Sequence, residues 1–329
     1  MSTAIVHHGD ADGCASGALA LLGNKEGKLF SPTVGGSNLD EKLLSEVEKF
    51  DRIIVVDIGE KTQELMDRLA DGRELLWIDH HKDEELIEGD FTYINPHNEG
   101  KKAPPASFLT YDYFKKKTSM EPYSWVAAIG ILGDRAEKNH PEIFKKSFEL
   151  FPNLEGGPSY GEMAILKKFV GIISSGRSFG SGKGAVEAAE ILVEAAKQGK
   201  PEIVLESPLM RYAKVTTRQV NDIINRGDYE VEGNLVLCEL NTPQYIQNYV
   251  AGKLRGKFRE KTVAVSNAGL YPKQVRIELR GNGERDLRAD AIELSKGIGS
   301  GGGHIGAAGM RIEKSEWKNL KQKLIERLS

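Results

Sequence analysis

The chain has 329 residues and a mass of 36.2 kDa, with 40% hydrophobic and 28% charged residues. At about 150 residues per domain, this length predicts two domains of a folded globular protein. No apolar run approaches the ~20 residues of a membrane-spanning helix, and the first residues lack the pattern of a signal peptide. Two cysteines far apart, Cys14 and Cys238, predict neither a disulfide framework nor a thiolate zinc site, so we expect a reducing, cytoplasmic setting.

The formal net charge of −3 is unevenly distributed along the chain. Residues 230–329 contain 17 basic and 12 acidic side chains, so residues 1–229 carry a net charge of −8. A basic C-terminal part suits a polyanionic ligand, and an acidic N-terminal part suits cations. A charge of this size also fits an ordinary solvated surface.

Strand and helix patterns alternate over the first 130 residues. Apolar strands are predicted at 4–7, 52–56 and 75–78, and helices at 14–22 and 62–69. This alternation predicts an α/β fold with a doubly wound parallel sheet.

Helical patterns dominate the next part of the chain, and strand patterns return near its end. Helices are predicted at 123–132, 161–174, 185–196, 209–224 and 316–328, and strands at 235–240, 262–265 and 274–279. We therefore expect a catalytic domain at 1–200, a linker helix region at 201–230 and a smaller α/β domain at 231–329. A cleft is expected between the two domains.

Each of the three apolar strands of the N-terminal part is followed by aspartate or histidine. The first leads into His8-Gly9-Asp10-Ala11-Asp12-Gly13, the second into Asp57 and the third into Asp79-His80-His81. We expect a fourth apolar segment, ending at Asp134, to reach the same edge of the sheet, where parallel strands place their carboxyl ends. Carboxylates with a minority of imidazoles suit Mn²⁺ or Mg²⁺ better than a structural zinc ion. Two such ions ~3.5–4 Å apart clamp the attacking and leaving oxygens of phosphoryl transfer.

Each of these residues also has a purely structural explanation. An aspartate after a strand often caps a helix, which would account for Asp12, and adjacent histidines such as His80 and His81 occur on surfaces. The joint occurrence of four such sites favours the metal centre.

Two glycine-rich stretches are candidate loops. Residues 297–303 contain five glycines before His304, which predicts a loop whose backbone N–H groups wrap a phosphate. A dinucleotide-binding fingerprint is disfavoured there because the preceding segment has a helical pattern. Residues 174–184 lack the spacing of a phosphate-binding P-loop, since Arg177 occupies the first glycine position. We expect a loop there, before the helix at 185–196.

Residues 253–261 place five cations at every second position around Phe258. Basic residues with an aromatic suit single-stranded nucleic acid, although a solvated helix end also fits.

The four N-terminal sites resemble, in order, the four motifs of the DHH phosphoesterase superfamily. The first motif reads His8-x-Asp10-x-Asp12-Gly13-x-x-Ser16. Residues 299–309 are similar to the Gly-Gly-Gly-His motif of the DHH-associated C-terminal domain, and residues 275–280 resemble its strand ending in a substrate-binding arginine. The superfamily includes RecJ-type exonucleases, nanoRNA hydrolases, cyclic-di-AMP phosphodiesterases and family II pyrophosphatases. The spacing of the first motif is shorter than that of the pyrophosphatases.

The resemblance implies a role for each motif residue. One Mn²⁺ would be held by His8, Asp10 and Asp57, and a second by Asp12, Asp57, His80 and Asp134, with Mg²⁺ as the alternative ion. The resemblance gives catalytic roles to two residues. Asp79 would support the second metal site, and His81 would contact the substrate phosphate or assist the leaving group. The implied substrate-binding residues are Arg280, Gly301, Gly302, Gly303 and His304.

The resemblance favours a two-metal phosphodiesterase that hydrolyses single-stranded DNA or RNA or short oligonucleotides, like a RecJ-like exonuclease or an oligoribonuclease. One alternative is a phosphodiesterase or phosphatase acting on cyclic-di-AMP or another small nucleotide. Another is a catalytically silent replication or repair scaffold, although every expected metal ligand is present. Small relatives are commonly homodimers.

Overall fold

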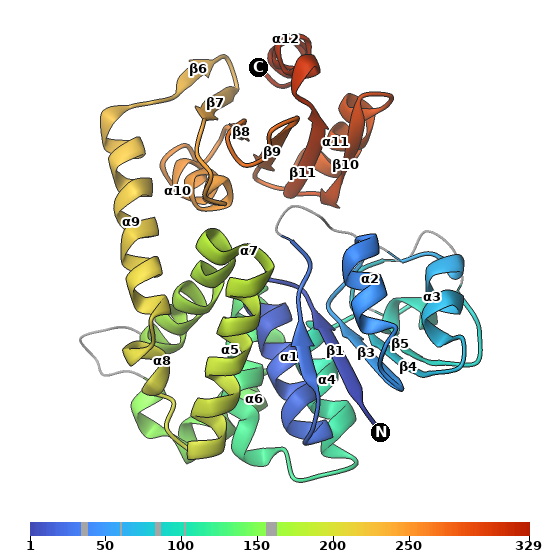
Figure 1. The fold of residues 1–329 in the computed structure, drawn as a ribbon. Coiled ribbons are helices and arrows are strands. Elements are labelled where there is room, and N and C mark those ends of the chain that lie inside the picture. Colours follow the sequence, from blue (N-terminus) through green and yellow to red (C-terminus); the bar gives the residue numbers. More distant parts are fainter. Residues whose placement is uncertain (34–38, 60, 83–86, 102, 156–162) are drawn as a thin grey trace. The chain divides into compact units, whose positions relative to one another are not determined.

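The computed structural model describes residues 1–33, 39–59, 61–82, 87–101, 103–155 and 163–329. The chain forms two compact units, Met1–Ala213 and Lys214–Ser329, and the division falls inside helix α9 (Leu209–Arg226) (Figure 1). Among the helices described, none combines the length and the apolar composition needed to cross a membrane.

The N-terminal unit is built on a parallel sheet of five strands. In spatial order they are β2 (Lys28–Phe30), β1 (Thr3–His7), β3 (Arg52–Val56), β4 (Glu74–Ile78) and β5 (Thr92–Ile94). Runs of apolar, mostly branched residues fill β1, β3 and β4 because both faces of a parallel sheet are covered. The three predicted strands are confirmed. The edge strands β2 and β5 have three residues each, too few to give a sequence pattern.

Helices cover both faces of this sheet, as expected for a doubly wound fold. Ile5 and Ile54 point into one core, whereas their neighbours Val6 and Val55 point into the other. The first core is completed by α1 (Ala11–Asn24), α4 (Ala106–Lys115), α5 (Ser124–Gly133), α6 (Pro141–Leu150), α7 (Ala164–Gln198) and α8 (Ile203–Glu206). The second core is completed by α2 (Glu41–Val47) and α3 (Gln63–Ala70). Of the helix predicted at 161–174, residues 161 and 162 lie outside the described residues.

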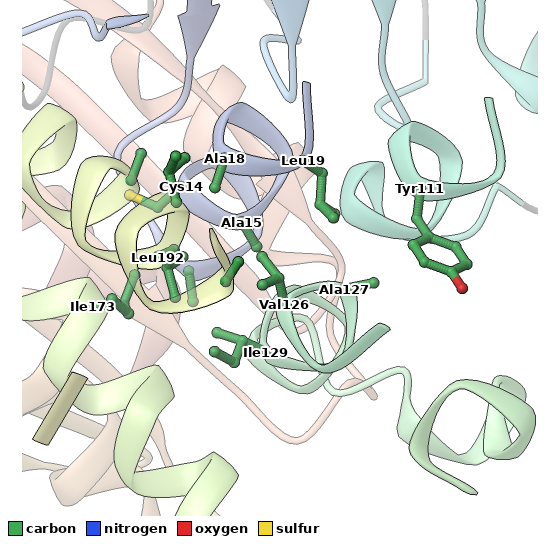
Figure 2. Packing of buried hydrophobic residues seen from close by; sticks show 14 of the residues in the cluster. Cys14, Ala15, Ala18, Leu19, Tyr111, Val126, Ala127, Ile129, Ile173 and Leu192 are labelled. Atoms are coloured by element: carbon green, nitrogen blue, oxygen red, sulfur yellow. The ribbon is translucent and has the colours of Figure 1, made fainter. Parts of the chain in front are cut away.

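Helix α1 packs closely on its neighbours because its buried face consists of small residues. Ala15 and Ala18 are fully buried, in the same core as Val126 of α5 and Leu192 of α7 (Figure 2). Cys14 lies in this core too, and burial raises the pKa of its thiol well above the ordinary value. Because the thiolate is the reactive form, Cys14 is a packing residue.

The glycine-rich stretch at 174–184 is helical and not the predicted loop. Two helices within the range of α7 meet there, and the non-helical backbone of Ser181 (φ 53°, ψ −137°) marks the sharp break between them. Gly176 and Gly184 meet across the kink, where a Cβ on either would overlap with the carbonyl oxygen of the other. These glycines therefore permit a close approach of backbone to backbone.

The C-terminal unit contains a mixed sheet of six strands. In spatial order they are β10 (Gly299–His304), β11 (Ala307–Glu313), β9 (Gln274–Arg280), β8 (Thr262–Asn267), β7 (Leu235–Leu240) and β6 (Glu230–Glu232). Only the pairing of β7 with β8 is parallel. Helices α11 (Leu287–Ser295) and α12 (Trp317–Leu328) cover one face, and α10 (Gln247–Lys257) packs on part of the other. The α/β class predicted for this part is confirmed.

The glycine run before His304 forms strand β10, which corrects the predicted loop. Gly301 pairs with Met310 of β11, and a Cβ at Gly301 would overlap with the carbonyl oxygen of Ala291 in α11. Gly303 has a φ of +131°, which residues with side chains rarely adopt. Glycine lets the helix lie directly on the edge strand, so the run forms a strand despite its low strand propensity.

Candidate functional site

Strands β1, β3 and β4 bring their predicted site residues to one edge of the five-stranded sheet. Asp57 immediately follows β3, and the Asp79-His80-His81 run follows β4. Asp134 reaches this edge differently, as the C-cap of helix α5 and not at the end of a strand. The residues before it form the helix predicted at 123–132, and they are buried on all sides.

His8, Asp10 and Asp57 form the first group of potential metal ligands. The Nδ1 atom of His8 lies 3.0 Å from Oδ2 of Asp10 and 3.5 Å from Oδ2 of Asp57. One ligand atom from each of the three side chains lies within 4.8 Å of the other two. The group comes from two neighbouring strands, β1 and β3, as the parallel topology requires.

Asp12, His80 and Asp134 form a second group with the same compactness. The Nε2 atom of His80 lies 3.9 Å from Oδ2 of Asp12 and 3.5 Å from Oδ2 of Asp134. The same nitrogen lies 3.2 Å from Oδ1 of Asp57. Asp57 therefore contacts a histidine of each group, one through each of its carboxylate oxygens.

An unusual backbone conformation accompanies the central position of Asp57. Its φ is +59°, in the left-handed region that side-chain-bearing residues seldom occupy. The backbone N–H donates to the carbonyl of Ile78, the last residue of β4, at 3.0 Å. The side chain is only 3% exposed. Such a strained, buried carboxylate is typical of functional sites.

The two aspartates of the first motif have different structural partners. Asp10 is the N-cap of α1, and its Oδ1 accepts from the N–H of Gly13 at 3.0 Å. The predicted helix cap is thus Asp10 and not Asp12. The carboxylate of Asp12 instead accepts from the backbone N–H groups of Ala106 and Ser107, at 2.7 and 3.0 Å, in the first turn of α4. These bonds fix the Asp12 carboxylate in a buried position between two helices.

Asp79 is turned toward a separate pair of partners. Its Oδ1 lies 2.8 Å from Nδ1 of His81, and its Oδ2 accepts from Nζ of Lys61 at 2.7 Å. Both Asp79 and Lys61 are almost completely buried. His81 also lies within ligand distance of Asp57 and His80. Sequence reasoning missed Lys61, because a single lysine between two predicted elements carries no pattern.

A cation from helix α7 adds to the first group. The Nη1 atom of Arg177 lies 3.8 Å from Oδ2 of Asp10, with its side chain mostly buried. The sequence placed this arginine in a loop. Because the segment is helical, Arg177 approaches the Asp10 carboxylate from a rigid element.

The five predicted substrate-binding residues lie in the C-terminal unit. Arg280 of β9 and His304 of β10 are both register partners of Ala307 in β11, so the three residues form one row across the sheet. Arg280 forms an ion pair with Glu278 of the same strand. The predicted glycines 301–303 precede His304 within β10.

The basic stretch at 253–261 begins within helix α10, which agrees with the alternative of a helix end. Cations two residues apart on a helix point in different directions, so they form no continuous stripe. Phe258 is partly buried against the core, with its ring 5.5 Å from that of Tyr229. This arrangement does not present Phe258 for base stacking.

Residues 2–132 match the model of the DHH family, N-terminal domain. This part of the chain is a DHH-family domain. A search of curated proteins gave no significant match.

Solved structures extend the likeness of the fold beyond the DHH domain. An exonuclease RecJ bound to manganese matches with a TM-score of 0.75 at 16% identity, over 100% of this chain and 91% of that one. RecJ from Thermus thermophilus in complex with Mn²⁺ matches with a TM-score of 0.74 at 16% identity, over 99% of this chain and 51% of that one. A pGpG-specific phosphodiesterase from Vibrio cholerae matches with a TM-score of 0.51 at 13% identity, over 99% of this chain and 98% of that one. At these identities the likeness establishes a RecJ-like fold.

The electrostatics of the DHH domain fit a cation at this edge. Burial and the nearby carboxylates raise the pKa of Asp12 to about 7 and that of Asp134 to about 9. Burial alone would lower the pKa of His80, but Asp57, Asp12 and Asp134 raise it to about 10. These two carboxyl groups therefore keep their protons to a higher pH than ordinary aspartates, because burial and the neighbouring carboxylates disfavour their charged form. Oxygen-rich ligands with a few imidazoles suit Mn²⁺ or Mg²⁺, which would replace those protons.

Proposed function

We propose that the chain is a metal-dependent phosphodiesterase that hydrolyses single-stranded or short nucleic acid. The observation that carries this proposal is the pair of ligand groups, on one sheet edge, that meet at Asp57. Two neighbouring cation sites that share a carboxylate are the arrangement used for phosphoryl transfer. The DHH family match and the RecJ-like fold support the same class of hydrolase.

In this proposal His8, Asp10 and Asp57 would hold one ion, and Asp12, Asp57, His80 and Asp134 would hold the second. Mn²⁺ is the proposed ion, with Mg²⁺ as the alternative; RecJ of Thermus thermophilus was solved with each of them. When bound, the ions would activate water and neutralise charge on the phosphoryl oxygens.

The protein side chains around the ions would position the substrate and the reacting groups. Lys61 and Asp79 would fix the orientation of His81 through the two contacts of the Asp79 carboxylate. His81 would then donate a hydrogen bond to the substrate phosphate or to the leaving oxygen. In the C-terminal domain, Arg280 and His304 would bind a phosphate, with the glycines 301–303 allowing a close approach to the backbone.

A small nucleotide is the second candidate substrate. The likeness to a pGpG-specific phosphodiesterase, whose chain is covered to 98%, favours this alternative. Both candidates use the same metal centre and differ in the size and form of the substrate.

One activity panel with Mn²⁺ tests the proposal. It would contain cyclic-di-AMP, pApA, and 5′-labelled DNA and RNA strands of increasing length, with chelator-treated enzyme and Asp57→Ala as controls. Mononucleotides released from the strands would support the nuclease, and turnover of only cyclic-di-AMP or pApA would support the small-nucleotide alternative. Equal rates for wild type and Asp57→Ala would contradict both. No hydrolysis by a protein with two bound ions would leave the scaffold interpretation.

A further inference from the structure

Three polar side chains in the core of the N-terminal unit have no hydrogen-bond partner among the described residues for one of their polar atoms. They are His7, the last residue of β1, Ser16 of α1 and Thr110 of α4, and each is completely buried. The atoms concerned are Nε2 of His7 and the two hydroxyl oxygens. Native proteins leave few buried polar groups unsatisfied, and an ordered water commonly bridges such groups.

The two hydroxyls differ from other buried hydroxyls in helices of this unit. Ser147 of α6 and Ser175 of α7 each donate to a carbonyl one turn earlier in the same helix, at 2.7 and 2.6 Å. Ser16 and Thr110 make no such bond. Neither hydroxyl is therefore satisfied by its own helix, and each needs a partner from outside it.

Contacts at two heights along α1 and α4 place these hydroxyls opposite each other. At one height the Asp12 carboxylate accepts from two backbone N–H groups in the first turn of α4, at 2.7 and 3.0 Å. At the other, the ring of Phe114 fills the space beside Gly23, where a Cβ would overlap with it. The two helices therefore run side by side in the same direction. Ser16 lies one turn beyond Asp12, and Thr110 lies one turn beyond the N–H donors.

His7 reaches the same junction from the sheet. Its imidazole packs on α1 at Gly17, the neighbour of Ser16, where a Cβ would come within 2.7 Å of Cδ2 of the ring. Nδ1 lies 2.8 Å from the carbonyl oxygen of His8, which can only accept, so Nδ1 carries a proton. Burial lowers the pKa of His7 to about 4, so the ring is neutral at pH 7. Nε2 is therefore an acceptor, whereas the two hydroxyls can donate.

We propose that a buried water molecule binds at this junction, accepting from the hydroxyls of Ser16 and Thr110 and donating to Nε2 of His7. A buried water makes about three hydrogen bonds, and these three groups supply them with the right polarity. The water joins β1, α1 and α4 one turn away from the bonds that hold the Asp12 carboxylate. It is thus a positioning site for Asp12, and this part of the inference rests on the proposed function.

Unfolding of the full chain in EDTA tests the water without catalysis. Ser16→Ala and Thr110→Val each remove one hydroxyl, and Thr110→Ser is the matched control that keeps the hydroxyl and loses a methyl group. Each removal should lower the melting temperature by about 2–4 °C, the effect of one lost hydrogen bond in a unit of this size.

The effects of Ser16→Ala and Thr110→Val should add to less than their sum, because the first substitution already disrupts the water site. The same cycle with Thr110→Ser should be additive. If nothing bridges the hydroxyls, Thr110→Val removes an unsatisfied buried donor and should raise the melting temperature. That rise, or additive effects of the two hydroxyl removals, would overturn the inference.

A crystal structure of wild type gives the direct observation. We expect an ordered water within hydrogen-bond distance of both hydroxyls and of Nε2 of His7, and a direct bond between the hydroxyls with no water would overturn the inference.

Mn²⁺ titration, followed by the melting temperature, separates positioning of Asp12 from packing. The double variant Ser16→Ala, Thr110→Val should bind Mn²⁺ about tenfold more weakly than wild type, and Thr110→Ser should bind it like wild type. A folded double variant that binds Mn²⁺ like wild type would overturn the positioning role. If wild type binds no Mn²⁺, the proposed function fails, whereas the water is still decided by the unfolding cycle and the crystal structure.

Discussion

Asp57 combines a strained backbone with a shared carboxylate, and two substitutions separate these properties. Asp57→Ala and Asp57→Gly both remove the carboxylate, but only alanine keeps a Cβ at the φ of +59°. A left-handed conformation costs a residue with a side chain ~1–2 kcal/mol, whereas glycine loses about 0.5–1 kcal/mol of extra backbone entropy. We therefore expect the glycine variant to be more stable than the alanine variant by about 0.5–1 kcal/mol.

This difference is measurable as a shift in melting temperature. The N-terminal unit spans Met1–Ala213, and for a unit of this size 1 kcal/mol corresponds to about 2–4 °C. In metal-free protein, Asp57→Gly should melt about 1–4 °C above Asp57→Ala. Differential scanning calorimetry in EDTA would measure both variants under identical conditions.

The shared carboxylate leads to a second, independent prediction for the same two variants. At a Mn²⁺ concentration of 100 Kd, one occupied site stabilises wild type by about 2.7 kcal/mol. Both variants should lose most of this stabilisation and all detectable hydrolysis, because each ligand group loses a member. Asp57→Asn, which tolerates positive φ but lacks the charge, is the control that separates backbone strain from metal binding.

Two results would refute this reasoning. If Asp57→Ala melts at or above Asp57→Gly, the strain assigned to the Asp57 backbone is not present in the folded protein. If Mn²⁺ raises the melting temperature of either variant as much as that of wild type, Asp57 is not the shared ligand.

Three further predictions concern stability. Because the raised pKa values of Asp134 (about 9) and His80 (about 10) mean that the folded state holds extra protons, the metal-free protein should lose stability as the pH rises from about 6.5 to 9. Adding Mn²⁺ should restore the most stability at pH 9. A metal-free melting temperature that does not fall as the pH rises would contradict this prediction. Lys61→Met removes the cation beside the buried Asp79 carboxylate and should lower the free energy of unfolding, measured in urea, by about 3–5 kcal/mol. Adding Asp79→Asn should recover part of this loss. If the effects of the two substitutions are simply additive, the two residues do not act as a pair. Ser181→Gly should gain about 1 kcal/mol by removing positive-φ strain, and an unchanged urea midpoint would contradict that.

The sequence predicted those parts of the fold in which the local pattern and the tertiary role agree. The branched apolar run at β3 can only be a buried strand, and Asp57 directly after it had to lie at the sheet edge. The edge strands β2 and β5 have only three residues each, so no periodicity could reveal them. Helix α5 confirms the helix predicted at 123–132, and Asp134 reaches the expected edge as the C-cap of that helix.

Glycine produced the two larger errors, for a single physical reason. In α7 and in β10 the glycines do not loosen the chain but allow another backbone to come close, at Gly184 and at Ala291 respectively. A sequence shows that a side chain is missing but not which atom occupies its place. Contacts made by one side chain, such as Lys61 with Asp79 or Arg177 with Asp10, are equally invisible in a pattern.

The places where local rules fail therefore separate into two kinds. At Gly176 and Gly301 the exception is explained inside the chain, because a neighbouring backbone fills the space. At Asp57 the strained backbone instead places a carboxylate between the imidazoles of His8 and His80, among other acids. Natural sequences retain such exceptions chiefly where a ligand supplies the missing partner. A cation bound by the two groups that meet at Asp57 would be such a partner.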